Sequence, residues 1–188
     1  MRLNIGSDTL VLPRERWINH DIRKVHPDII ELDVRQGLPY SADSVEEIYG
    51  GNFFDHLSLY EGLQFLGDCH RVLKSGGAVK LSLMDTDKII NAYLYDTMNQ
   101  FNKIQPSEYS AMREKSLKFA TFLLGNLAKG EKEYSGHKML YTPSSIKEVA
   151  SQVGLTTKYL ICPPFDVEPW TVSDKNHQSH CFYVELIK

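Results

Sequence analysis

The chain has few of the features that mark secreted, membrane-spanning or nucleic-acid-binding proteins. Its three cysteines are an odd number without C-x-x-C spacing, so a disulfide framework is not expected. No apolar run approaches the roughly eighteen residues that a membrane-spanning helix needs. The net charge is −3 and the lysines and arginines do not cluster, which argues against nucleic acid as the main partner.

The chain does contain enough apolar sequence for a single domain. Hydrophobic residues make up 42% of its 188 residues, which is sufficient to bury an ordinary core. Met1 leads directly into a strand-like run with no signal sequence before it, so we expect a cytoplasmic protein. Cys162 and Cys181 fall on the last two expected strands and are interpreted as reduced, buried thiols.

Three strand-like runs near the start of the chain end at Gly6, Asp21 and Asp33. In an open α/β sheet, a glycine at one strand tip lets the backbone approach a ligand, and an acid at the next tip accepts hydrogen bonds from ribose hydroxyls. This pairing favours a cofactor that contains a nucleoside. A plain turn at Gly6 and ordinary strand-ending acids are the alternative interpretation.

The glycine loop lacks the other glycines of a dinucleotide fingerprint, since Gly6 is followed by Ser7 and Asp8. Only fifteen residues separate Gly6 from Asp21, so the first helix is expected to be short or missing. Without that helix N-terminus there is no ready site for a pyrophosphate, which disfavours NAD and FAD. A cofactor with a ribose but no phosphate fits better.

The rest of the chain alternates between strand and helix patterns. The expected strands cover residues 44–52, 78–84, 156–162 and 181–187. One helix is expected over 58–73, closed by Lys74 to Gly77, and another between a cap at Ser144 or Ser145 and Gly154. Two helical patterns, 89–103 and 106–127, form an insert at about 88–130, and its many aromatic residues predict a lid over the ligand edge of the sheet.

Five ordered segments resemble a class I S-adenosylmethionine-dependent methyltransferase, and the resemblance covers nearly the whole chain. They are Leu3–Gly6, Trp17–Asp21, Leu38–Tyr40, Asp55–Leu57 and Arg71–Gly77. The particular likeness is to small methyltransferases of the type 11 kind, often found beside cell-surface polysaccharide genes. It implies an α/β, Rossmann-like sheet of seven strands in the order 3-2-1-4-5-7-6, with an antiparallel last strand. It also implies cofactor binding at the carboxyl ends of the first four strands.

The resemblance assigns roles to individual residues at those strand ends. The residues expected at S-adenosyl-L-methionine are Asn4, Gly6, Ser7, Asp21, Ile22, Asp33, Val34, Asn52 and Phe53. Asp21 would accept from the ribose, Asp33 would lie at the adenine, and Phe53 at the methyl group. Asp8 departs from the family pattern, because it stands where these proteins carry a second glycine.

Methyl transfer from a sulfonium depends largely on positioning and desolvation, and a base is needed only for hydroxyl or protonated amine acceptors. The candidates for such a group are His56, Asp85, His137 and Tyr141. Helix capping or packing is the alternative for His56 and Asp85. No metal is expected, because Asp85 and Asp87 are typical helix caps and His177-x-x-His180 has no third ligand.

The sequence therefore predicts S-adenosylmethionine-dependent methyl transfer to a small-molecule or glycan-linked acceptor by one domain spanning residues 1–188. The alternative is a non-catalytic binding or scaffold subunit of the same fold, indicated by Asp8 in the glycine loop. In either case the aromatic insert provides a surface for a homo-oligomer. Aminopropyl transfer from the decarboxylated cofactor is a third hypothesis that Asp85 and Asp87 permit.

Overall fold

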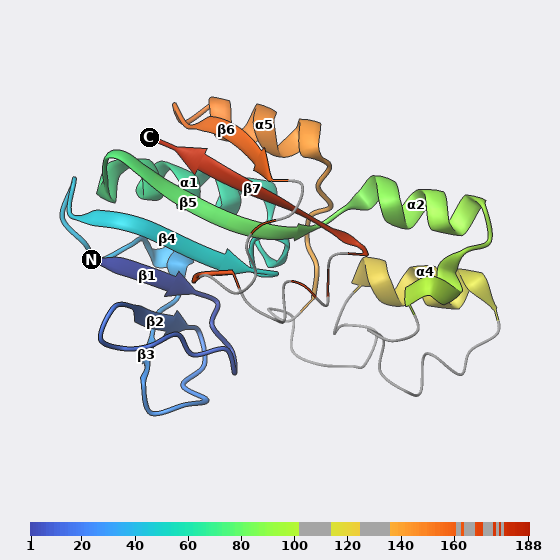
Figure 1. Cartoon of the computed structure of the whole chain (residues 1–188), viewed down its shortest axis with the longest axis horizontal. Coiled ribbons are helices and arrows are strands. Elements are labelled where there is room, and N and C mark those ends of the chain that lie inside the picture. The colour runs from blue at the N-terminus through green and yellow to red at the C-terminus, as the bar shows by residue number, and fades with distance from the viewer. Residues whose placement is uncertain are drawn as a thin grey trace.

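The computed structural model describes residues 1–101, 114–124, 136–160, 163, 168–170, 175, 177 and 179–188. Seven strands form one sheet in the order β3-β2-β1-β4-β5-β7-β6 (Figure 1). They are β1 (Arg2–Ile5), β2 (Ile18–Asp21), β3 (Ile29–Glu31), β4 (Val45–Gly51), β5 (Leu73–Met84), β6 (Thr156–Leu160) and β7 (Cys181–Ile187). β7 is antiparallel to both neighbours and every other pair is parallel, which confirms the predicted sheet.

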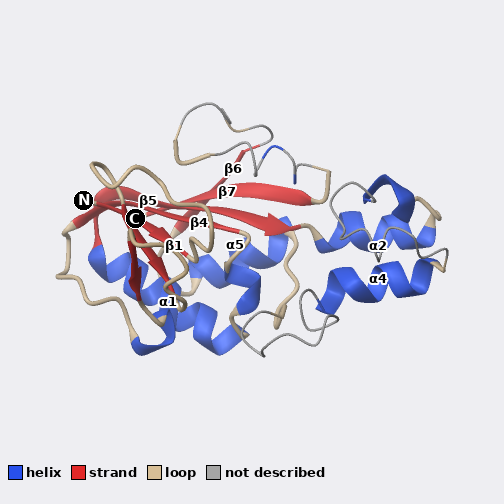
Figure 2. Cartoon of the chain, turned by 90° about the horizontal axis from the view of Figure 1, so that it is seen from below, coloured by secondary structure: helices blue, strands red, loops and turns tan. Residues whose placement is uncertain are grey.

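Two helices cover one face of this sheet. Figure 2 shows α1 (Leu59–Val72) and α5 (Pro143–Ser151) together on the same side. α1 begins at a capping box, in which Ser58 and Glu61 each accept a hydrogen bond from the other's backbone N–H. Its apolar residues recur at helical spacing and pack into the main core with Leu3 and Ile48 of the sheet. No helix in the described ranges is both long and apolar enough to cross a bilayer.

Three of the expected element boundaries are wrong. α1 ends at Val72, and the residues expected to close it, Lys74 to Gly77, belong to β5. Thr142 caps α5 instead of either serine, because Pro143 occupies the first helical position and Ser145 completes the capping box. The helix expected over 89–103 breaks after Leu94, and Asp96 then adopts a positive φ. Cys162 lies outside the described residues.

The other face of the sheet is covered by loops at its centre. Residues 6–17, all of them described, contain no helix, which confirms the expected loss of the first helix. Trp17 packs there with Trp170 from the connection before β7, and the Trp17 indole N–H donates to the Glu168 carboxylate at 3.0 Å. The Trp170 ring meets Tyr49 and Tyr183 edge-on, with centroids 5.9 and 5.5 Å apart.

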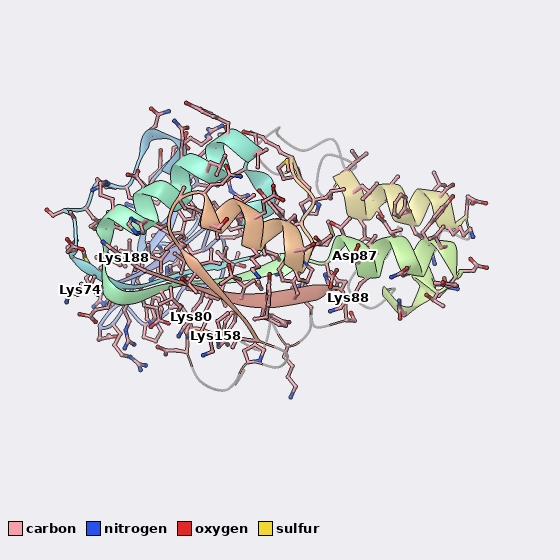
Figure 3. The ribbon with its side chains drawn as sticks, turned by 90° about the horizontal axis from the view of Figure 1, so that it is seen from above. Lys74, Lys80, Asp87, Lys88, Lys158 and Lys188 are labelled. Carbon is pink, nitrogen blue, oxygen red and sulfur yellow. The ribbon has the colours of Figure 1, made fainter. Side chains whose placement is uncertain are left out.

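A row of alternating charges crosses the rest of this second face. It consists of Arg2, Glu47, Lys80, Glu185 and Lys158, on β1, β4, β5, β7 and β6 respectively. Glu47 pairs with both Arg2 and Lys80, and Lys158 pairs with Glu185 at 3.1 Å. Figure 3 shows Lys80 and Lys158 along the sheet. Because opposite charges on neighbouring strands pair with one another, this part of the sheet is polar and needs no covering helix.

The insert is helical in the part that the structure describes. It contains α2 (Thr86–Leu94), the 3-10 helix η3 (Met98–Phe101) and α4 (Lys115–Leu124). α2 and α4 lie side by side beyond the carboxyl end of β5 and extend away from the sheet (Figures 1 and 2). They share a small core of Met84, Ile89, Ala92, Met98 and Phe122. Their closure over the site as a lid stays a prediction.

Candidate functional site

Gly6 directly follows β1 and lies beside Phe53, which follows β4. The glycine has φ +66°, a left-handed conformation that glycine adopts without strain. A Cβ atom here would lie 2.5 Å from the ring atom Cδ2 of Phe53. The next residue, Ser7, donates from both its N–H and its hydroxyl to the His20 carbonyl, which fixes the glycine loop to β2.

Asp21 is hydrogen-bonded to the glycine loop. Its buried carboxylate accepts hydrogen bonds from the backbone N–H groups of Asp8 and Arg23, each at 2.9 Å. The Arg23 guanidinium lies 2.9 Å from the Asp8 carboxylate and 3.5 Å from that of Asp21. The extra negative charge of Asp8 in the glycine loop is therefore balanced. Ile22, which stands between Asp21 and Arg23 in the chain, is partly buried.

Asp33 acts as a helix cap in this structure. It accepts from the Arg35 backbone N–H at the start of the 3-10 helix η1 (Val34–Gln36). Two further hydrogen bonds, of 2.8 and 2.7 Å, come from the Arg35 guanidinium and lower the pKa of Asp33. Val34 is buried in the main core. Contacts of either residue with an adenine stay a prediction.

Two asparagines expected at the cofactor tie strands and loops together. Asn4 is buried and donates to the Leu10 carbonyl and to the Asn19 side chain, so it supports the loop between β1 and β2. Asn52 has φ +48° at the tip of β4. Its side chain lies 3.3 Å from both the His177 ring and the Cys181 thiol, which joins β4 to the start of β7.

Two histidines expected on the acceptor side meet around an aspartate. Asp55 and His56 belong to the 3-10 helix η2 (Phe54–His56) after β4, and His137 comes from the segment before α5. The two imidazole centroids are 5.0 Å apart, and Asp55 Oδ2 is 3.6 Å from His137 Nε2. Sequence reasoning missed Asp55. Its signal was the Asp-His pair directly after a strand that ends in glycines.

The backbone sets the orientation of both rings. His56 Nδ1 donates to the Gly136 carbonyl at 3.1 Å, and His137 Nδ1 donates to the Phe122 carbonyl at 2.9 Å. Burial lowers the pKa of His56, and the nearby His137 lowers it further, although the Asp55 charge opposes both. His56 is therefore held as a neutral imidazole whose Nε2 can accept a proton or bind an ion.

Tyr141 pairs through an isolated β-bridge with Asp85, the residue between β5 and α2. The Tyr141 hydroxyl is buried without a hydrogen-bond partner among the described residues, and burial and Asp55 raise its pKa. It therefore stays protonated at neutral pH. Asp85 caps α2 by accepting from the N–H groups of Asp87 and Lys88, as helix capping predicts. Figure 3 shows Asp87 and Lys88 at this helix start.

No protein-family model matches this chain, and no curated protein does. Solved structures with the same architecture do match. A SAM-dependent methyltransferase from Archaeoglobus fulgidus is 14% identical, with a TM-score of 0.58 over 100% of this chain and 85% of that one. One from Mesorhizobium loti is 13% identical, with a TM-score of 0.57 over 100% and 90%. The chain has the class I methyltransferase fold.

A third match of this fold comes from a complex between the Haloferax volcanii Trm112 methyltransferase activator and a methyltransferase. It is 12% identical, with a TM-score of 0.57 over 99% of this chain and 81% of that one. At such low identities the comparison establishes the methyltransferase fold alone. Any chemistry depends on the residues at the carboxyl edge of β1, β2 and β4.

Proposed function

We propose that the chain binds S-adenosyl-L-methionine at the carboxyl ends of β1, β2 and β4 and transfers its methyl group to a small-molecule or glycan-linked acceptor. One observation carries the proposal. Gly6 in a left-handed conformation and the buried acid Asp21 end adjacent parallel strands, in a sheet with the strand order of S-adenosylmethionine-dependent neighbours.

The residues fit the adenosine half of the cofactor. A carboxylate offers about four acceptor positions, and backbone amides use two of those on Asp21, so the remaining two suit a ribose diol. Because Arg23 balances Asp8, the carboxylate of the methionine end would not meet an unpaired negative charge. The bound cofactor would supply an electrophilic methyl group.

The methionine half sets a condition on Phe53. This side chain lies against Gly6, where the backbone would otherwise approach the ligand. Binding therefore requires the ring to turn aside or to form one wall for the methionine chain. Next along the chain, His56 and its neighbour His137 lie on the acceptor side, where a neutral imidazole without a bound ion would take a proton from a hydroxyl or an amine.

The proposal is tested by calorimetry with S-adenosylhomocysteine. We expect binding by the wild type and at least about tenfold weaker binding by Asp21→Ala and Asp21→Asn, since each charged hydrogen bond contributes about 1.5 to 3 kcal/mol. Asp33→Ala is the matched acidic control and should cost less, because water can satisfy an adenine amino group. Absence of heat and of a thermal shift at millimolar ligand would exclude the proposal.

The contact between Phe53 and Gly6 favours a second candidate, a non-catalytic binding or scaffold subunit. In that case the wild type does not bind the cofactor and forms oligomers through its insert. Phe53→Ala would then remove the ring from the glycine loop and increase the affinity for S-adenosylhomocysteine. A wild-type monomer in sedimentation that binds the ligand excludes this alternative.

Mass spectrometry with labelled cofactor would identify the acceptor, and a tagged chain would test the cytoplasmic location.

A further inference from the structure

Asp55, His56 and His137 bring three metal-ligating groups together next to the proposed cofactor site. One ligand atom from each side chain lies within 4.8 Å of the other two. The Asp55 Oδ2 to His137 Nε2 distance is 3.6 Å. Two imidazoles and one carboxylate are a donor set that divalent ions of the first transition row bind, and such a triad leaves coordination positions open.

Backbone carbonyls fix the orientation of both imidazoles. A backbone carbonyl only accepts, so the contacts of His56 with Gly136 and of His137 with Phe122 place a proton on each Nδ1. In the neutral rings the lone pair then lies on Nε2. Histidines that bind metals commonly donate their other ring N–H to a carbonyl in this way, because the bond orients the ring.

Asp55 supplies a second, independent observation. Its side chain is only 5% exposed, and Oδ1 has no hydrogen-bond partner among the described residues. An unpartnered buried carboxylate oxygen is costly, and a bound cation would satisfy it. The Asp55 carbonyl meanwhile accepts from the N–H groups of Lys138 and Met139. This backbone pairing holds the segments that carry the three ligands together without an ion.

We propose that Asp55, His56 and His137 bind one divalent transition-metal ion of the zinc, iron(II) or manganese class. The two histidines are only partly buried, which leaves the ion a way in. Three protein ligands leave room for water or for an oxygen atom of a bound molecule. The site does not include Asp85 and Asp87 or the His177-x-x-His180 pair. It does not depend on binding of S-adenosylmethionine.

The test is a titration of chelator-stripped protein with zinc chloride, followed by calorimetry, and with cobalt(II), followed by visible absorption. We expect one ion per chain. His137→Ala and Asp55→Asn should each weaken zinc binding by at least about tenfold, the lower limit for losing even an outer-sphere partner. His26→Ala, at an exposed position, is the matched control and should bind as the wild type does. Circular dichroism confirms that each variant is folded, and His56→Gln replaces any that is not.

Two results would overturn the proposal. The first is wild-type protein that takes up neither ion at millimolar concentration, which would make Asp55 and His137 a simple ion pair. The second is loss of the ion in His177→Ala but not in His137→Ala, which would place it at the start of β7. Neither result bears on S-adenosylhomocysteine binding, so the two proposals can fail separately.

Discussion

At the scale of single residues, Gly6 meets two separate demands. Its positive φ disfavours every residue with a Cβ atom, and the Phe53 ring fills the space in which that atom would lie. Gly76 on β5 also has a positive φ, of +76°, but a Cβ there would meet nothing within 4 Å. The pair therefore separates backbone strain from the steric contact with Phe53.

We predict that Gly6→Ala destabilises the protein more than Gly76→Ala does. Left-handed backbone costs an alanine about 1–2 kcal/mol, which is the whole expected effect at position 76. At position 6 the contact with Phe53 adds to it. Urea denaturation of both variants measures the difference in the free energy of unfolding. Equal losses would show that Phe53 does not pack on Gly6 in solution.

At the scale of elements, the second face of the sheet shows how a methyltransferase fold can do without its first helix. The loop at 6–17 brings Trp17 onto the sheet, and Trp170 arrives from the connection before β7. These rings bury the centre of the face, while the mutually paired charges from Arg2 to Lys158 line the remainder. Two short segments thus replace a helix.

We predict that Trp170→Ala lowers the free energy of unfolding by about 3–5 kcal/mol, because its ring is buried against Tyr49 and Tyr183. For a chain of this length that lowers Tm by roughly 2–4 °C per kcal/mol. Thermal denaturation measures the effect. Tyr60→Ala removes an exposed aromatic and is expected to leave Tm nearly unchanged. Similar Tm values for the two variants would contradict this packing of the second face.

At the scale of the whole molecule, several buried groups make stability depend on pH. His180 stands just before β7 and its ring meets Phe122 of α4 edge-on, so it lies where the insert joins the sheet. Burial lowers the pKa of His180 to about 3, and the charges of His177 and Lys88 contribute. Burial also lowers the pKa of His20 on β2.

We predict that stability falls as the pH drops below the ordinary histidine value of 6.5. Between 6.5 and about 3 the unfolded chain binds a proton at His180 that the folded chain excludes, so acid favours unfolding, and the full stability is present above 6.5. His180→Phe should flatten the slope of unfolding free energy against pH in this window. His26→Gln, an exposed control, should keep it. An unchanged slope in His180→Phe would show that this ring is accessible to protons.

Local sequence patterns were enough to predict which segments along the chain form strands. The first five strands are local patterns that end at or next to a glycine or an acid, and the short separation of Gly6 and Asp21 already excluded a full first helix. The predicted start of α5 was wrong because several neighbouring side chains could have capped the helix. Thr142 outcompeted two serines as the α5 cap because Pro143 fixed the first helical position.

The contacts of the polar side chains at the strand ends could not be predicted from such patterns. Asp33, which is expected at the adenine, also caps a 3-10 helix and pairs with Arg35, a partner two residues later in a turn that the pattern does not specify. His137 lies far along the chain from Asp55 and His56. The hydrogen bond from the Lys138 N–H to the Asp55 carbonyl brings the two segments together. Local patterns fix local structure, whereas a site made from distant segments depends on packing and hydrogen bonds that form only in the folded chain.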